Sequence, residues 1–135
     1  ISYLRARLSN KISLEFEHPK DEIIVYLNNQ LFSWSLENII KNSIDSIKDS
    51  GKVKISIIED NEYLKIYISD NGIGIKQSLK NKIFNPGVTT KERGWGLGLS
   101  LSKRIIEEYH KGEIKLIESI VGQGTKMLIK LKAVK

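Results

Sequence analysis

Residues 89 to 101 read TTKERGWGLGLSL and place three glycines at alternate positions directly before an apolar helical pattern. Glycine loses more backbone entropy on ordering than any other residue, so glycines at the start of a helix need a compensating interaction. A helix N-terminus offers unpaired N–H groups and the positive end of the helix dipole, which together favour an anion. Lys91 and Arg93 precede the glycines and can add charge-assisted hydrogen bonds. The stretch therefore predicts a site for a polyphosphate.

The composition indicates one ordinary globular domain, because the 135 residues are 28% charged and 40% hydrophobic. There is no cysteine, which excludes a disulfide scaffold and a thiolate zinc site. The longest apolar runs fall far short of the ~20 residues that a membrane span needs, and no signal peptide is recognisable. The sequence begins at Ile1 without a methionine, so we expect a segment of a longer protein.

The net charge of +6 has two interpretations. The ordinary one is a solvated surface rich in lysine, and a basic balance also suits anionic ligands or an acidic partner protein. The lysines are spread over the predicted strands and helices, without a dense basic block or an aromatic ladder. Nucleic acid is therefore the less favoured partner.

Hydrophobic periodicity predicts the first elements. Residues 12–18 alternate apolar and polar, as a half-buried strand does, and residues 23–27 are a candidate second short strand. A helical period runs from about residue 29 to 49, and Gly51 is its expected stop. The apolar stripe of this helix consists of Phe32, Leu36, Ile39, Ile40, Ile44 and Ile47.

The second half of the chain continues with a hairpin. The alternating runs KVKISII and YLKIYIS flank the polar turn EDNE and predict two antiparallel strands. We expect a short helix over residues 76–83 and a longer one over about 97–111, with Gly112 as its stop. The predicted apolar face of the longer helix carries Leu101, Ile105 and Tyr109. Two closing strands surround IVGQG.

The order strand, helix, hairpin, helix, strand pair predicts the fold class. Adjacent strand pairs favour mostly antiparallel pairing, with the helices packed on one face of the sheet. We therefore expect an α+β fold, a two-layer α/β sandwich with a mixed, mostly antiparallel sheet.

Three polar residues share one face of the first helix. Asn38, Asn42 and Asp45 are spaced i, i+4 and i+7. Asparagine is a mediocre helix former, so two of them in mid-helix suggest a function, although an exposed polar face explains them equally well. In the functional interpretation Asn42 presents its amide oxygen to Mg²⁺, which prefers oxygen ligands and bridges protein to nucleotide phosphates.

The stretch SDNGIGI, residues 69–75, follows the second strand of the hairpin. Asp70 stands at the strand end, where its carboxylate could accept a hydrogen bond from an exocyclic amine. Gly72 and Gly74 could let a flat base approach the backbone. Neither G-x-G-x-x-G nor G-x-x-x-x-G-K-[ST] is present. Taken alone, this stretch and GQGT at residues 122–125 also fit plain turns.

Together and in this order the motifs resemble the ATP-binding catalytic domain of sensor histidine kinases. The wider GHKL superfamily shares a Bergerat-type fold with DNA gyrase B, Hsp90 and MutL. The sequence NIIKNSIDSI resembles the N box, DNGIGI the G1 box, KIFNPGVTTK the F box, GWGLGLSL the G2 box and GQGT the G3 box. The resemblance covers residues 10–132. It implies one catalytic domain over residues 1–135, with residues 1–9 as the tail of a linker from a dimerisation domain.

The resemblance also implies roles for single residues. Asn42 would bind Mg²⁺ with Asn38 assisting, and Asp70 would bind the adenine amine with support from Thr125 through a water. Residues 85–95 would form a mobile lid over ATP. The implied catalytic residues are Asn42, Lys91 and Arg93. The other residues implied to line the nucleotide site are Asp45, Gly72, Gly74, Ile75, Phe84, Thr89, Thr90, Gly94, Gly96, Leu97, Gly98 and Leu99.

Asp45 departs from the pattern of many family members, which carry a basic residue at this position. It resembles a subgroup with an NAxDA N box and a TTK lid, in which Lys91 would replace the missing positive charge.

The implied activity is transfer of the γ-phosphoryl group of Mg-ATP to a histidine on a separate dimerisation domain, for relay to the receiver domain of a response regulator. His18 and His110 both lack the family's acceptor context, so the phosphoacceptor is expected outside this chain. We expect a cytoplasmic domain without nucleic-acid or direct membrane contact, whether or not the parent protein is anchored in an inner membrane. The alternatives are an anti-sigma-type serine kinase, a catalytically degenerate nucleotide-binding signalling module and an ATP-driven clamp.

Intrinsic ATP hydrolysis should be weak. Gyrase-like and MutL-like ATPases carry a water-activating glutamate four residues before the metal-binding asparagine, where this chain has Asn38. An amide cannot act as a general base, and the neighbouring Glu37 projects about 100° around the helix. A steady-state ATPase assay is expected to show slow turnover, and turnover comparable with that of a dedicated ATPase would contradict the assignment.

Overall fold

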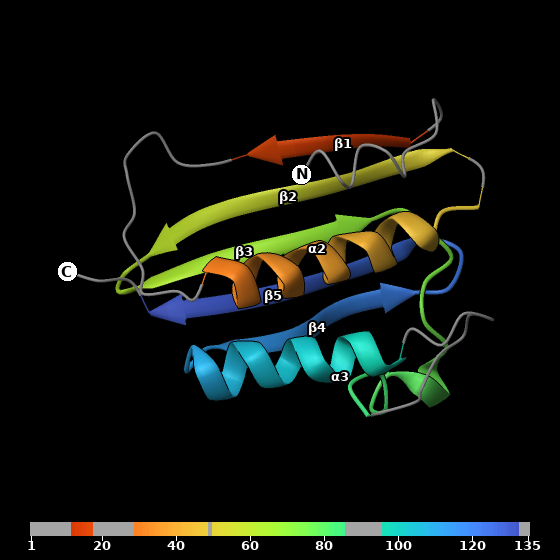
Figure 1. Cartoon of the computed structure of the whole chain (residues 1–135). Helices are drawn as coiled ribbons and strands as arrows, with labels where there is room; N and C mark the ends of the chain where they lie inside the picture. Colours follow the sequence, from red (N-terminus) through yellow and green to blue (C-terminus); the bar gives the residue numbers. More distant parts are fainter. Residues whose placement is uncertain (1–11, 18–28, 49, 86–95, 133–135) are drawn as a thin grey trace.

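The computed structural model describes residues 12–17, 29–48, 50–85 and 96–132 (Figure 1). Its elements in chain order are β1 (Ile12–Glu17), α2 (Asn29–Asp45), β2 (Gly51–Asp60), β3 (Tyr63–Asp70), the 3₁₀ turn η1 (Gln77–Leu79), α3 (Gly96–Arg104), the π-helical turn η2 (Ile105–Tyr109), β4 (Glu113–Ile120) and β5 (Gly124–Lys132). The predicted order of strand, helix, hairpin, helix and strand pair is confirmed.

The strands form one five-stranded sheet in the order β1-β2-β3-β5-β4. β1 pairs with β2 in parallel, and the other three pairs are antiparallel. Both helices cover the same face of this sheet, as Figure 1 shows. The predicted α+β two-layer fold with a mixed, mostly antiparallel sheet is therefore confirmed.

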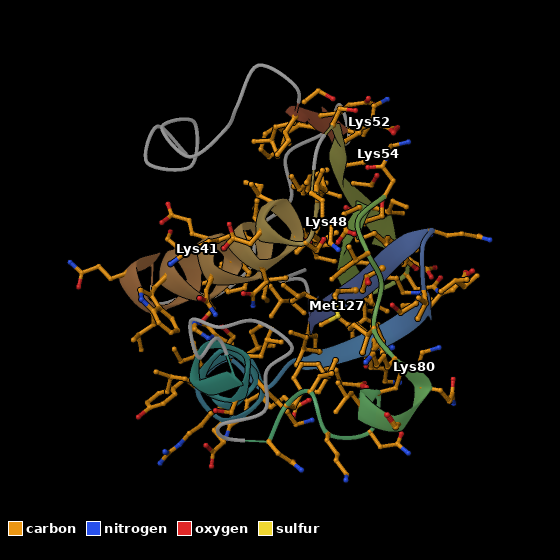
Figure 2. All side chains as sticks on the ribbon, turned by 90° about the vertical axis from the view of Figure 1, so that its right-hand side faces the viewer. Lys41, Lys48, Lys52, Lys54, Lys80 and Met127 are labelled. Carbon is orange, nitrogen blue, oxygen red and sulfur yellow. The ribbon has the colours of Figure 1, made fainter. Side chains whose placement is uncertain are left out.

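The hydrophobic core fills the space between the sheet and the helices. Alternate residues of the strands point toward the helices, as the period of a pleated strand requires. Figure 2 places one of them, Met127 of β5, between α2 and the sheet. The buried hydrophobic residues on this face of the sheet are Val53, Ile55, Leu64, Ile66, Ile68, Ile114, Met127, Ile129 and Leu131.

The apolar stripe predicted for α2 is confirmed. Five of its six residues are buried, namely Phe32, Ile39, Ile40, Ile44 and Ile47, and Leu36 packs partly buried against them. The helix itself ends at Asp45, earlier than predicted. Ile47 therefore lies just beyond it.

The predicted stop at Gly51 is wrong, because Gly51 is the first residue of β2. The end of α2 is closed locally instead. Ser46 donates from its backbone N–H to the Asn42 carbonyl oxygen at 3.1 Å and from its hydroxyl to the Ser43 carbonyl oxygen at 2.7 Å. Because Ser46 satisfies carbonyl oxygens at the end of the helix, no glycine is needed to terminate it.

The second long helix is less regular than predicted. A π turn follows Arg104 and holds one more residue per hydrogen-bonded turn than an α-helix. The predicted apolar face is correspondingly wrong at Leu101 and Tyr109, whose exposed fractions are 43% and 65%. Ile105, the third residue of that face, is buried as predicted, and the neighbouring Ile106 is buried with it.

Gly112 was expected to stop this helix, but the residue with the left-handed conformation at its end is Lys111. Lys111 adopts the left-handed conformation, with φ of 55°, and the N–H of Gly112 donates to the Ile106 carbonyl oxygen at 2.9 Å. This bond spans six residues, one more than the corresponding bond of a Schellman motif, and a lysine takes the left-handed position usually filled by glycine. Gly112 is required by packing, since a Cβ there would lie 2.5 Å from the Lys130 carbonyl oxygen.

Several predictions fall outside the described residues. They concern the linker tail at residues 1–9, the short strand at 23–27 and most of the lid at 85–95. The short helix predicted over residues 76–83 is present as the 3₁₀ turn η1 followed by further turns. Among the helices of the described ranges, none is long and apolar enough to cross a membrane.

The burial pattern predicts a contrast between two isoleucines of the hairpin. Ile68 in β3 is 0% exposed, whereas Ile58 in β2 is 47% exposed. Ile68→Ala should lower the free energy of unfolding by about 2–5 kcal/mol because it leaves a cavity. The matched Ile58→Ala should cost less than about 1 kcal/mol. Chemical denaturation measures both, and equal losses would contradict this description of the core.

Candidate functional site

The predicted motifs meet at one end of the molecule. The Phe32 ring near the start of α2 contacts the His110 ring beyond η2, with centroids 5.6 Å apart. Further along α2, Asn38 donates from Nδ2 to the Ser102 hydroxyl of α3 at 3.3 Å. The two helices are therefore antiparallel. One helical turn beyond the Asn38–Ser102 contact, α2 reaches Asn42, and α3, which runs the opposite way, has its first turn. In Figure 1 the end of β3 and the start of β5 lie at this same right-hand end, which Figure 2 shows face on.

The polar face of α2 points into this end of the molecule. Both amide atoms of Asn42 and Oδ2 of Asp45 lie below the solvent-accessible surface. The Nδ2 group of Asn38 is engaged with Ser102, so its Oδ1 atom is the one that can turn to a ligand. The structure thus confirms the shared helix face and adds a link from Asn38 to α3.

The donor set suits a metal ion that arrives with phosphate groups. The described residues contain no cluster of three or more His, Cys, Asp or Glu side chains that could hold a metal ion by themselves. Mg²⁺ in nucleotide sites is commonly held by one or two protein oxygens together with phosphate oxygens. A single amide oxygen from Asn42 fits that arrangement.

Asp70 is the last residue of β3 and is held in place on two sides. The Gly72 N–H donates to its Oδ1 at 2.9 Å, and the Ser46 hydroxyl lies 3.3 Å from the same oxygen. Burial raises the pKa of Asp70 above its usual value of 3.8, and hydrogen bonds from Gly72, Ser43 and Ser46 offset part of that rise. A carboxylate that has lost much of its water gains from a further N–H donor.

The glycines after Asp70 permit close packing. A Cβ at Gly72 would overlap the Ser46 hydroxyl, and the next residue, Ile73, donates from its N–H to the Ser46 carbonyl oxygen at 3.0 Å. Gly74 has φ of 78° and lies against the backbone of Ile120. The proposed approach of a base to these glycines stays a prediction, and packing alone already requires the residues.

Ser119 of β4 is a site residue that sequence reasoning missed. Its side chain is buried, and its hydroxyl accepts a hydrogen bond from the Ile75 N–H at 2.8 Å. The same hydroxyl lies 2.8 Å from the Thr125 hydroxyl. Thr125 in turn pairs in register with Asp70 across β3 and β5. No sequence pattern marks this residue, because strict alternation from Ile114 and Leu116 would have turned it toward solvent.

The other predicted site residues fall into three groups. Ile75, Phe84 and Leu99 lie partly buried against the core, and the Lys103 ammonium sits 5.2 Å from the centre of the Phe84 ring. Gly96, Leu97 and Gly98 form the first turn of α3, as the G2 box predicts. The lid residues outside the described ranges are Thr89, Thr90, Lys91, Arg93 and Gly94.

Comparison with known families agrees with this geometry. Residues 30–135 match the family described as histidine kinase-, DNA gyrase B-, and HSP90-like ATPase. The chain therefore belongs to this family of ATP-binding domains.

Its curated relatives include proteins of much longer chain. Nitrogen regulation protein NtrY of Azorhizobium caulinodans is 38% identical over 77% of this chain and 14% of its own length. Sporulation kinase A of Bacillus subtilis is 36% identical over 86% of this chain and 19% of its own length. The chain thus spans less than a fifth of these two relatives.

Solved structures show the same fold. The catalytic domain of histidine kinase ThkA superposes with a TM-score of 0.81 at 29% identity, over 97% of this chain and 83% of that one. The mycobacterial sensor histidine kinase MprB gives a TM-score of 0.82 over 98% of this chain and 88% of its own, and at 20% identity it supports the fold alone. The resemblance found in the sequence is confirmed.

The environment of Asp70 predicts a pH-dependent affinity for adenine nucleotides. Because burial raises the pKa of Asp70 above 3.8, protonation begins at a higher pH than for an exposed aspartate. Protonation removes the charged acceptor, so ADP affinity should fall as the pH is lowered from about 7 to about 5. Asp70→Asn keeps an acceptor oxygen but cannot titrate, and titration calorimetry should show a smaller fall for it. The phosphates of ADP titrate equally with both proteins, so parallel pH profiles would contradict the assignment.

Proposed function

We propose that this chain is the ATP-binding catalytic domain of a two-component sensor histidine kinase. It transfers the γ-phosphoryl group of Mg-ATP to a histidine on a separate dimerisation domain, for relay to the receiver domain of a response regulator. The observation that carries the proposal is the meeting of three groups at one end of the fold. They are the partly buried carboxylate of Asp70, the amide face of α2 with Asn42, and the N-terminus of α3 at Gly96. Family membership and the histidine kinase relatives support it.

Each group has a distinct task in the proposed site. Asp70 accepts a hydrogen bond from the adenine amine, and the first turn of α3 offers its backbone N–H groups to the phosphates. Asn42 is the residue that would hold Mg²⁺, with Asn38 assisting. The bound ion would neutralise phosphate charge, and positioning together with charge neutralisation dominates catalysis of phosphoryl transfer. In the lid, Lys91 and Arg93 are proposed to add positive charge.

The phosphoacceptor is proposed to come from another domain. His110 is a structural residue at the far end of the helices, with Nδ1 2.9 Å from the Ile105 carbonyl oxygen and its ring edge-on to Phe32. His18 lies outside the described residues. We propose accordingly that residues 1–135 form one catalytic domain, with residues 1–9 as a linker tail toward the acceptor domain.

Two substitutions should separate metal binding from base binding. Asn42→Leu should reduce affinity for Mg-ATP to the value that the unchanged chain shows for ATP in EDTA, because the metal loses its protein ligand. Asp70→Ala should weaken binding of ATP and ADP with or without metal. Asn81→Leu, at an exposed asparagine in the turn after η1, is the matched control. Isothermal titration measures all of these, and unchanged ADP affinity in Asp70→Ala would refute its role.

Phosphoryl transfer requires a protein that joins this chain to a histidine-bearing dimerisation domain. With radiolabelled ATP and Mg²⁺, acid-labile phosphate on histidine is expected. Acid-stable phosphate on serine alone would point to the anti-sigma-type alternative, and nucleotide binding without any transfer would point to a degenerate module.

A further inference from the structure

A row of three polar side chains crosses the sheet at the nucleotide end. Asp70 of β3 pairs with Thr125 of β5, and Thr125 pairs with Ser119 of β4. Because directly paired residues point to the same face of a sheet, all three face the helices. Ser119 is buried with only 2% of its surface exposed, and its hydroxyl meets that of Thr125 at 2.8 Å.

The hydrogen bonds of Ser119 constrain those of Thr125. A serine hydroxyl has one hydrogen and can accept two hydrogen bonds. The Ile75 N–H already donates to it at 2.8 Å. Its own hydrogen has two possible acceptors, the Thr125 hydroxyl at 2.8 Å and the Gly124 carbonyl oxygen at 3.3 Å. The second distance is longer than is usual for O–H···O, so donation to Thr125 gives up little.

Donation by Ser119 fixes which way the Thr125 hydroxyl points. Its oxygen then accepts from Ser119, and its own hydrogen is directed elsewhere, so Thr125 becomes a donor beside the acceptor Asp70. An isolated threonine hydroxyl can serve as donor or acceptor and would not distinguish between ligands on that basis. A threonine hydroxyl that a buried partner holds in one orientation presents only a donor to the ligand.

We propose that Ser119 is a positioning residue for base selection, acting through Thr125. The inference rests on the proposed function, in which Asp70 receives the adenine amine. Adenine offers a donor at its 6-amino group next to an acceptor at N1, and hypoxanthine offers an acceptor at O6 next to a donor at N1. The pair of Asp70 as acceptor and Thr125 as donor, directly or through one water, matches adenine at both points and opposes hypoxanthine at both.

The same hydroxyl also fastens the loop that carries the G1 motif to the strand pair that carries the G3 motif. Its bond to Ile75 and the bond from the Gly122 N–H to the Ile73 carbonyl oxygen at 2.8 Å join the two segments. A purely structural role for Ser119 would thus weaken binding of every nucleotide alike. A role through Thr125 changes the preference between bases.

The test compares ADP with inosine diphosphate, which differs only at the 6-position and N1 of the base. Ser119→Ala should lower the ratio of ADP affinity to inosine diphosphate affinity about 3- to 10-fold, because the freed Thr125 hydroxyl can then accept from hypoxanthine N1–H as well as donate to adenine. Thr125→Val should lower the ratio of ADP affinity to inosine diphosphate affinity by a similar factor. The double variant Ser119→Ala/Thr125→Val should lower it no further than Thr125→Val alone, because Ser119 acts on the ratio only through the Thr125 hydroxyl.

The same nucleotide titrations include a control variant and show which results would overturn the proposal. Ser56→Ala, at a serine on the opposite face of the sheet in β2, should leave the ratio unchanged. Equal losses for both nucleotides in Ser119→Ala, or additive effects in the double variant, would overturn the proposal. If thermal unfolding shows that Ser119→Ala is unstable, Thr125→Val still tests the proposal. An unchanged affinity ratio in Thr125→Val would show that Thr125 does not select the base, and Ser119 could then not act through it. Failure of the unchanged chain to bind ADP would refute the proposed function rather than this inference.

Discussion

The contact between the end of α2 and the end of β3 is the constraint on which the rest of the site depends. Ser46 closes the last turn of the helix with its hydroxyl on the Ser43 carbonyl oxygen, and the same hydroxyl faces Asp70. Its carbonyl oxygen receives the N–H of Ile73, and its side chain occupies the space that a Cβ at Gly72 would need. One serine thereby fixes the distance between the face that carries Asn42 and the carboxylate proposed to bind the base.

The electrostatics of the molecule differ between the two faces of the sheet. On the face away from the helices, lysines pair with acidic neighbours, as in Lys52 with Glu15 and Lys65 with Asp60, or lie over tyrosine rings, as Lys130 lies over Tyr63. Such exposed pairs contribute little to stability, because water screens them, and mainly keep the surface solvated. This face fits the ordinary interpretation of the +6 net charge as a lysine-rich solvated surface.

On the helix side the same sheet carries a partly buried carboxylate and two hydroxyls in one row. A β-bulge between Leu116 and Glu118 produces this arrangement, because it shifts the alternation of β4 by one residue and turns Ser119 inward. Ile120 is 42% exposed as a result, because strict alternation from Ile114 and Leu116 would have turned it inward. The bulge thus places a hydroxyl opposite Thr125, where an unshifted register would place Glu118, at the cost of leaving Ile120 partly exposed to water.

The amino-acid sequence by itself determined the order of the elements, the apolar face of α2 and the boxes that identify the family, because these depend on local periodicity and on short motifs. It could not determine the π turn after Arg104, the lysine at the left-handed position before Gly112 or the bulge in β4. Nor could it show that Asn38 contacts Ser102 or that Ser119 contacts Thr125. Each of these results from side chains brought together by packing between segments distant in the chain or from a one-residue shift in register, and hydrophobic period alone carries no information about either.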